Sequence, residues 1–135
     1  MSAQDCLEQI KTKLILSNVI NFLVVVTERA MGNRGYFRAR MTLANGDFLE
    51  VSEYFLAGPE GCSTLEYRHQ WMDRTKQRLI KRWDNARHFP ELTNFPHHIH
   101  AGSETEVMPG KVMSVIALID LFEAEFIKTF NNNTP

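Results

Sequence analysis

The fold is decided by residues 36–56, which read YFRARMTLANGDFLEVSEYFL. Polar and apolar side chains alternate over residues 36–43, the period of a strand with one buried face. Asn45-Gly46 follows, a dipeptide that favours the tight turn of a two-stranded hairpin. Residues 48–56 then return as the partner strand. The sequence therefore predicts an antiparallel hairpin.

Further strands are predicted on both sides of this hairpin. Residues 19–28 are rich in Val, Ile and Phe, and residues 63–73 and 79–84 read as two more strands around a polar tip. Consecutive strands joined by short turns form an antiparallel meander. We therefore expect a sheet of about five strands.

The two ends of the chain predict helices. Apolar residues recur every three to four positions in residues 3–16 and again in residues 111–130. Both helices should pack their apolar faces against the sheet. At this length the chain, residues 1–135, is expected to be a single α+β domain.

The composition and the spacing of the two cysteines limit the classes of protein to which the chain can belong. Hydrophobic residues make up 44% and charged residues 23%, as in ordinary globular domains. No apolar run approaches the twenty residues of a membrane span, and Asp5 and Glu8 replace the basic start of a secretory signal. Cys6 and Cys62 form no C-x-x-C pair, which favours free thiols in a reducing compartment. We expect a cytoplasmic protein that does not bind membranes.

The net charge of −1 conceals an uneven distribution. Residues 67–88 contain seven Lys or Arg against two Asp or Glu. A local cationic surface attracts polyanions even when the whole molecule is neutral. The alternative is that Arg74, Lys76 and Arg78 only solvate the tip of a hairpin.

Four of the five histidines lie within residues 88–100. Prolines at 90, 96 and 109 interrupt regular structure there, so we expect a long loop. Imidazole titrates near neutrality and also binds metals, so this cluster predicts a functional site. It leaves the chemistry of that site open.

One chemistry is metal binding. His98 and His100 lie on the same side of an extended backbone, and His88 or Glu53 can complete a ligand set. No H-E-x-x-H pattern, paired cysteines or Asp-rich loop accompanies them. We therefore expect no metal and no other cofactor.

A second chemistry is metal-independent cleavage of a phosphodiester. His98 and His100 would act as general base and acid, and Arg68 and Arg82 would bind the phosphate. Alternation along the strands puts charged residues on a polar, concave face of the sheet, where Glu53 would join the catalytic group. The residues expected to bind an unpaired base or the rest of the substrate are Tyr67, Trp71, Trp83, Arg38, Arg40 and His88.

The third interpretation is structural. Asp84 and Asn85 would hydrogen-bond the backbone of the loop, while the histidines would pack and satisfy buried carbonyl groups. Four histidines in one proline-bounded segment favour a function over this alternative.

Several segments resemble the TumE-like family of small prokaryotic proteins. They are RGYFRARMTLANGD at residues 34–47, YRHQWMD at 67–73, and RWDNA at 82–86 followed by FPHHIH at 95–100. The likeness runs from about residue 18 to residue 122, and the combination of R-W-D-N with P-H-H-x-H at this interval is rare.

The resemblance implies the toxin of a two-gene toxin–antitoxin system, with a small DNA-binding antitoxin as partner. The family pattern after Asn85-Ala86 usually reads Pro-His-His-Pro, whereas this chain has Arg87-His88-Phe89-Pro90. A catalytic role for the second histidine of that pair would make this chain impaired. We therefore assign the site to His97, His98 and His100.

Together these features predict a toxin-like ribonuclease that acts on RNA without a metal. The competing class is a non-catalytic module that binds a protein or a nucleic acid. A homo-oligomer is compatible with either.

Overall fold

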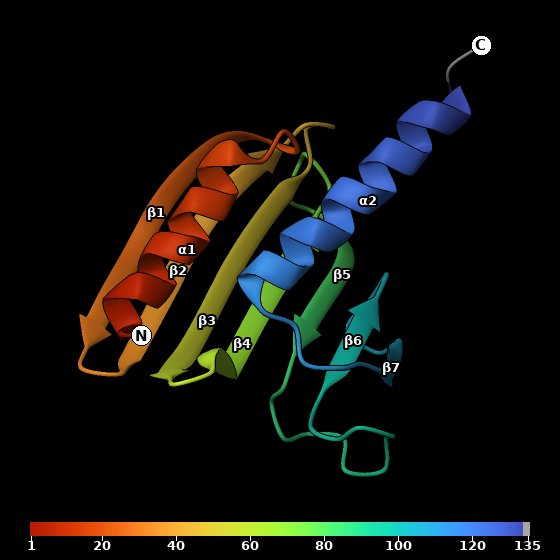
Figure 1. The fold of residues 1–135 in the computed structure, drawn as a ribbon. Coiled ribbons are helices and arrows are strands. Elements are labelled where there is room, and N and C mark those ends of the chain that lie inside the picture. Colours follow the sequence, from red (N-terminus) through yellow and green to blue (C-terminus); the bar gives the residue numbers. More distant parts are fainter. Residues whose placement is uncertain (134–135) are drawn as a thin grey trace.

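The protein folds as a seven-stranded sheet with two helices on one face (Figure 1). The computed structural model describes the backbone of residues 1–133 and the side chains of residues 1–126. Along the chain the elements are α1 (Ala3–Leu16), β1 (Ile20–Met31), β2 (Arg34–Leu43), β3 (Phe48–Gly58), β4 (Gly61–Met72), β5 (Leu79–Asp84), β6 (His98–Ala101), β7 (Val107–Pro109) and α2 (Val115–Asn133).

The strands follow one another in sequence order, and every neighbouring pair is antiparallel. The expected α+β meander is confirmed. The predicted hairpin forms as β2 and β3, with Thr42 opposite Phe48. Gly46 has a φ of 91° in the turn, a left-handed conformation that costs glycine little.

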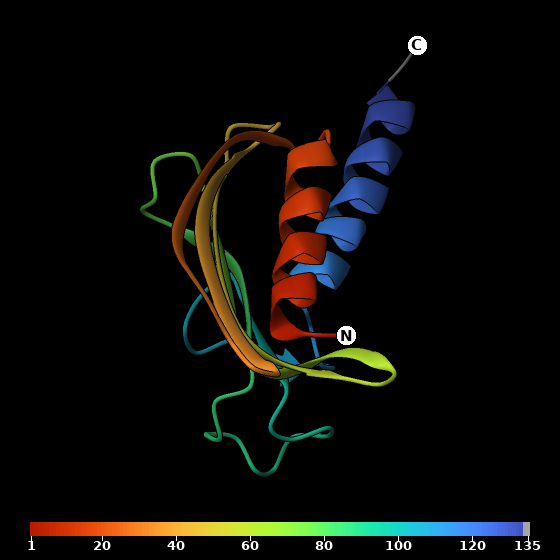
Figure 2. The same cartoon turned by 60° about the vertical axis from the view of Figure 1, so that its left-hand side comes forward.

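Both helices cover the same face of the sheet, which curves around them (Figure 2). Helix α1 begins with a capping box, in which the Ser2 hydroxyl accepts from the Asp5 N–H and the Asp5 carboxylate accepts from the Ser2 N–H. Apolar side chains of the sheet and the helices form one core. Its largest fully buried members are Phe37, Phe55, Phe122, Leu14, Met41, Leu43, Leu49, Leu118 and Ile119.

The expectation of about five strands was wrong, because the proline-rich segment contains two more. The loop ends at residue 97, and β6 then pairs with β5 and β7. Pro96 precedes β6, and Pro109 is the last residue of β7, an edge strand where a missing N–H costs no ladder bond. A four-residue strand therefore fits between the prolines.

The expectation of free thiols was also wrong. Cys6 of α1 and Cys62 of β4 form a disulfide, with Cα atoms 6.0 Å apart. Packing of α1 against the start of β4 brings together two residues that are 56 positions apart in sequence. The wide sequence spacing of the two cysteines is therefore no evidence for a reducing compartment.

Within the described residues, no helix has both the length and the apolar character needed to cross a membrane.

His69 of β4 is a neutral histidine inside the core. Its side chain is fully buried, its Nε2 lies 2.8 Å from the Met113 carbonyl, and its Nδ1 lies 3.4 Å from the Ser52 nitrogen. The carbonyl only accepts and the amide only donates, so the proton is on Nε2. Burial lowers the pKa of His69 from 6.5 to about 4.

We predict that His69 makes the protein less stable at mildly acidic pH. Its pKa is lower in the folded chain, so the unfolded chain binds the extra proton, and stability falls as the pH drops from 6.5 towards 4. The contribution is roughly 3 kcal/mol at most. Urea unfolding between pH 4 and 7 measures it, and in His69→Gln the acid-dependent loss should shrink. An equal pH dependence in both proteins would contradict the assignment.

Helix α2 begins on a buried carboxylate from the sheet. The Val115 N–H donates to Glu53 Oε1 over 2.8 Å, and the Thr64 hydroxyl donates to Glu53 Oε2 over 2.7 Å. Ser114 also caps this helix through the Ala117 N–H, at 3.0 Å. Burial raises the pKa of Glu53, and these two donors oppose that rise. A negative charge here also complements the helix dipole.

We therefore predict that Glu53→Gln destabilises the fold by about 1–3 kcal/mol, because an amide cannot accept at both of its polar atoms. The free energy of unfolding in urea measures the change. Glu66→Gln is the matched control, since Glu66 is exposed on the opposite face of the sheet, and its effect should stay within about 0.5 kcal/mol. Equal effects of both changes would contradict this role for Glu53.

Candidate active site

One face of the sheet is polar and is turned away from the helices. Its charged residues cluster on β4, β5 and β6. The antiparallel register sets Arg68 of β4, Asp84 of β5 and His98 of β6 side by side in one row. The next row contains Gln70, Arg82 and His100. Residues two apart on a strand share a face, so both rows project to the same side.

Asp84 lies at the centre of this group. Its Oδ1 is 2.9 Å from His98 Nε2, and its Oδ2 is 3.6 Å from His100 Nε2. Arg82 Nε donates to Oδ2 over 3.3 Å, and the Ala86 N–H donates to Oδ1 over 3.0 Å. Asp84, His98 and His100 are only 5%, 1% and 4% exposed, so this is a closely packed polar cluster.

Backbone carbonyls fix how the two imidazoles point. His98 Nδ1 lies 2.9 Å from the Pro96 carbonyl, and His100 Nδ1 lies 3.0 Å from the Glu104 carbonyl. Carbonyl oxygens only accept, so each Nδ1 carries a proton and each Nε2 is left facing Asp84. Burial lowers the pKa of His100, which favours its neutral form. The Asp84, His98 and His100 side chains therefore offer three potential metal ligands, whose atoms lie within 4.8 Å of one another.

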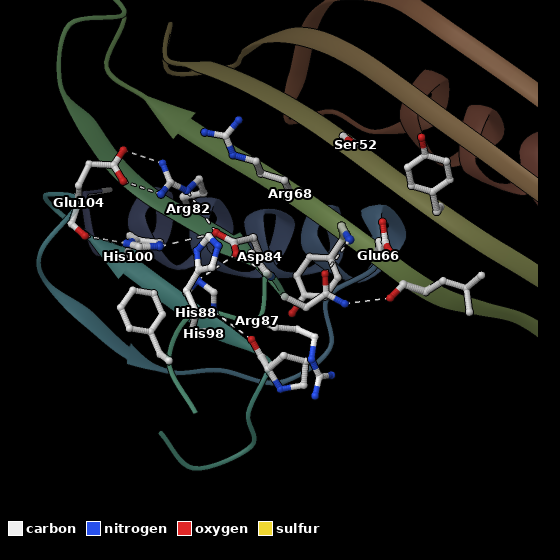
Figure 3. Close-up of a pocket in the computed structure, with 17 residues that line it drawn as sticks. Ser52, Glu66, Arg68, Arg82, Asp84, Arg87, His88, His98, His100 and Glu104 are labelled. Atoms are coloured by element: carbon white, nitrogen blue, oxygen red, sulfur yellow. Dashed lines mark hydrogen bonds and ion pairs between the residues drawn. The ribbon is translucent and has the colours of Figure 1, made fainter. Parts of the chain in front are cut away.

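Arg82 connects this cluster to the β6–β7 turn (Figure 3). Its two terminal nitrogens donate to the Glu104 carboxylate over 2.6 and 2.5 Å, in the bidentate geometry preferred by guanidinium groups. This bond raises the pKa of Arg82 and holds that of Glu104 below its usual value. The positive charge of Arg82 is therefore already neutralised by Glu104 in the absence of a ligand.

A hollow of about 950 Å³ opens over the cluster (Figure 3). The sheet curves towards the helices, so the polar face is not concave as expected; the segment after β5 and the β6–β7 turn form walls of the hollow instead. Arg68, Arg87 and His88 line it and are exposed. Phe89 lies against both histidines, with ring centroids 4.9 Å from His98 and 5.9 Å from His100. His98, His100, Arg68 and Arg82 thus all line one hollow.

His97, assigned to the catalytic group, does not join it. It precedes β6, and its Nδ1 bonds the Tyr67 hydroxyl at 2.9 Å beside the core. Burial lowers the pKa of His97 and raises that of Tyr67. His97 therefore helps to hold the end of the loop against β4.

The three aromatic residues expected to bind a base face the helices instead. Tyr67 and Trp83 are buried, and Trp71 and Trp83 pack edge-on against Phe122 of α2. Alternation correctly places Tyr67 and Trp71 on one face of β4, but that face is the core. The expectation that these aromatic residues bind a base was therefore wrong. The expectation that Glu53 joins the catalytic group was also wrong, because Glu53 binds the start of α2.

The remaining assigned residues lie around the cluster. Arg38 and Arg40 of β2 share the polar face, and both pair with Glu50, at 3.2 and 2.7 Å. The Asn85 side chain accepts from the Tyr67 N–H and donates to the Leu65 carbonyl, so it ties the segment after β5 to β4. Asp84 was assigned only a structural role, yet it contacts both histidines.

Sequence reasoning missed Glu104 and the position of Phe89. Glu104 lies in a turn with no motif of its own, and only the pairing of β6 with β7 brings it to Arg82. The repeat His98-Ile99-His100 beside Arg82-Trp83-Asp84 was the available signal, since two short alternating segments can pair as strands.

Comparison with known proteins agrees with the resemblance. A search of curated proteins and a search of solved structures each gave no significant match. The family model described as "Toxin TumE" matches residues 10–130. This match covers most of the chain and includes every residue of the cluster. The chain therefore belongs to the TumE toxin family.

Proposed function

We propose that this protein is the toxin of a type II toxin–antitoxin system and that it cleaves RNA in the hollow over Asp84, His98 and His100. The observation that carries the proposal is the convergence of two histidines, a carboxylate and arginines at one accessible hollow. Membership of a toxin family supports the toxic role. The expected partner is a small DNA-binding antitoxin.

The charges of the hollow suit a phosphodiester. Arg82 is already neutralised by Glu104, whereas Arg68 donates to the Gln70 side-chain oxygen over 3.4 Å and forms no ion pair with a carboxylate among the described side chains. Arg87 lies over the Phe95 ring, 4.9 Å from its centre. Exposed guanidinium groups bind phosphate oxygens in a bidentate manner. Arg68 and Arg87 are therefore the groups assigned to the RNA backbone.

Cleavage requires one proton to be removed and one to be supplied. The ribose 2′ oxygen forms a bond to phosphorus while the bond to the 5′ oxygen breaks; a base takes the 2′ proton, and an acid protonates the leaving oxygen. The products are a 2′,3′-cyclic phosphate and a 5′-hydroxyl. Without a metal, one of His98 and His100 would act as the base and the other, protonated on both ring nitrogens, as the acid, and their Nε2 atoms face the same carboxylate. In this metal-free reaction, protons would therefore have to move between the RNA and the two Nε2 atoms by way of the Asp84 carboxylate.

The proposal predicts that His100→Gln lowers the rate of RNA cleavage by about 10²- to 10⁴-fold, the usual contribution of a general acid or base. Arg68→Ala should lower it by about 10²-fold through lost stabilisation of the transition state. Arg68 is exposed, so its replacement does not endanger folding. Single-turnover cleavage of labelled RNA by the purified protein measures both effects.

His97→Gln is the matched control, since it changes a neighbouring histidine outside the cluster and should keep nearly the full rate. Unchanged cleavage in His100→Gln and Arg68→Ala would remove the hollow from the reaction. No cleavage of any RNA by wild-type protein that still stops cell growth would reject the ribonuclease.

The alternative is a binding module without catalysis. Arg74, Lys76 and Arg78 lie exposed in the β4–β5 turn, where they present three cations together. RNA binding without cleavage, with steep salt dependence and loss of affinity when these three are changed to Ala, would favour it.

A further inference from the structure

The cluster contains an unexplained feature at His98. Its Nε2 is 2.9 Å from Asp84 Oδ1, yet it is not aligned for a hydrogen bond. Among the side chains that the structure describes, it is the one buried nitrogen or oxygen that lacks a partner. A buried polar atom without a partner costs about 1–3 kcal/mol, so its presence calls for a ligand or a function.

We propose that Asp84, His98 and His100 bind a divalent transition-metal ion of the zinc type. The three side chains supply two Nε2 atoms and one carboxylate oxygen, a combination common at catalytic zinc sites. Such a site leaves at least one position for water or substrate, and here that position faces the hollow.

The spacing of the ligand atoms fits one ion. Bonds of about 2.0–2.2 Å at tetrahedral angles put neighbouring ligand atoms roughly 3.4 Å apart. The contacts from Asp84 to His98 and His100 are 2.9 and 3.6 Å, on either side of that value. All three atoms lie within 4.8 Å of one another, so only a small closure of the side chains is needed.

The groups behind the ligands are those that a metal site needs. Both imidazoles donate Nδ1–H to backbone carbonyls, which fixes each ring with Nε2 towards the proposed ion. The Asp84 carboxylate is held by Arg82 and by the Ala86 N–H. Both rings are therefore already turned towards the proposed ion.

The charge of the ligand set suits a cation. Arg82 and Glu104 offset each other, and as ligands one carboxylate and two imidazoles would contribute one negative charge. A bound divalent ion would give the cluster one net positive charge, which attracts a phosphodiester. Imidazole ligands select Zn²⁺, Co²⁺ or similar ions over Mg²⁺ and Ca²⁺, which prefer oxygen.

Use of the metal in RNA cleavage rests on the proposed function, whereas metal binding itself does not. In that role the ion would polarise a non-bridging phosphate oxygen, and the metal-free reaction favoured by the sequence would be replaced. The bonds formed and broken and the products stay as given above, but water would exchange the two protons, because the Nε2 atoms of His98 and His100 would be bound to the ion.

The test uses full-length protein without an affinity tag, stripped by a chelator and kept oxidised so that Cys6 and Cys62 remain paired. Zn²⁺ should bind one ion per chain by calorimetry and should raise the melting temperature. Co²⁺ should give the visible absorption bands of a low-coordinate site. Mg²⁺ at the same concentration should do neither.

The variants locate the site. Asp84→Asn, His98→Gln and His100→Gln should each weaken Zn²⁺ binding by more than about 100-fold, since even loss of a supporting contact costs 10- to 100-fold. His97→Gln should bind as the wild type does. The proposal would be overturned if the wild type did not bind Zn²⁺, or if the His98 and His100 variants bound Zn²⁺ with the affinity of the wild type.

The two proposals fail separately. Zinc binding at the cluster without cleavage of RNA by the zinc-loaded protein supports the metal site and rejects the ribonuclease. Cleavage in excess chelator by protein that binds no Zn²⁺ supports the ribonuclease and rejects the metal site.

Discussion

The register between β5 and β6 is the constraint on which the site depends. It sets Asp84 opposite His98 and Arg82 opposite His100. A shift of one residue would turn the histidines into the core and Ile99 out of it. Trp83 and the Ile99 side chain oppose such a shift, since they pack on the helix side of the same strands. The apolar core thus fixes where the imidazoles meet the carboxylate.

This dependence explains why the helices matter for a site that they do not touch. Phe122 of α2 receives the edges of Trp71 and Trp83, which holds β4 and β5 in place. Glu53 fixes the start of the same helix. The polar residues on the opposite face can then be crowded around Asp84, because the strands that carry them are already held.

Local patterns in the sequence predicted most of the fold. The Asn45-Gly46 turn, the alternation around it and the two amphipathic helices are short-range signals, and the structure contains them all. The β6 strand was missed because four residues between prolines carry too little pattern to distinguish a strand from a loop. The Cys6–Cys62 bond was missed because it depends on how α1 packs.

For the site, alternation grouped residues correctly but could not say which group faced the core. Tyr67 and Trp71 were therefore assigned to the wrong face. Glu53 was misplaced for another reason, since it lies three positions from Glu50 on β3 and so cannot share the polar face with it. His97 was grouped with its neighbours, although adjacent residues of an extended chain point in opposite directions. The contact of Arg82 with Glu104 required the pairing of strands that the sequence did not predict.

The most direct test of this account is the protonation of the histidine rings. Nitrogen-15 NMR of the metal-free protein near neutral pH distinguishes Nδ1 from Nε2 in each ring, and the chain has only five histidines. We expect His98 and His100 to carry their proton on Nδ1 and leave Nε2 bare, whereas His69 carries its proton on Nε2. A proton on Nε2 of His98 or His100 in the metal-free protein would contradict this account, because that ring would then be a donor to Asp84 and its Nε2 would not be bare.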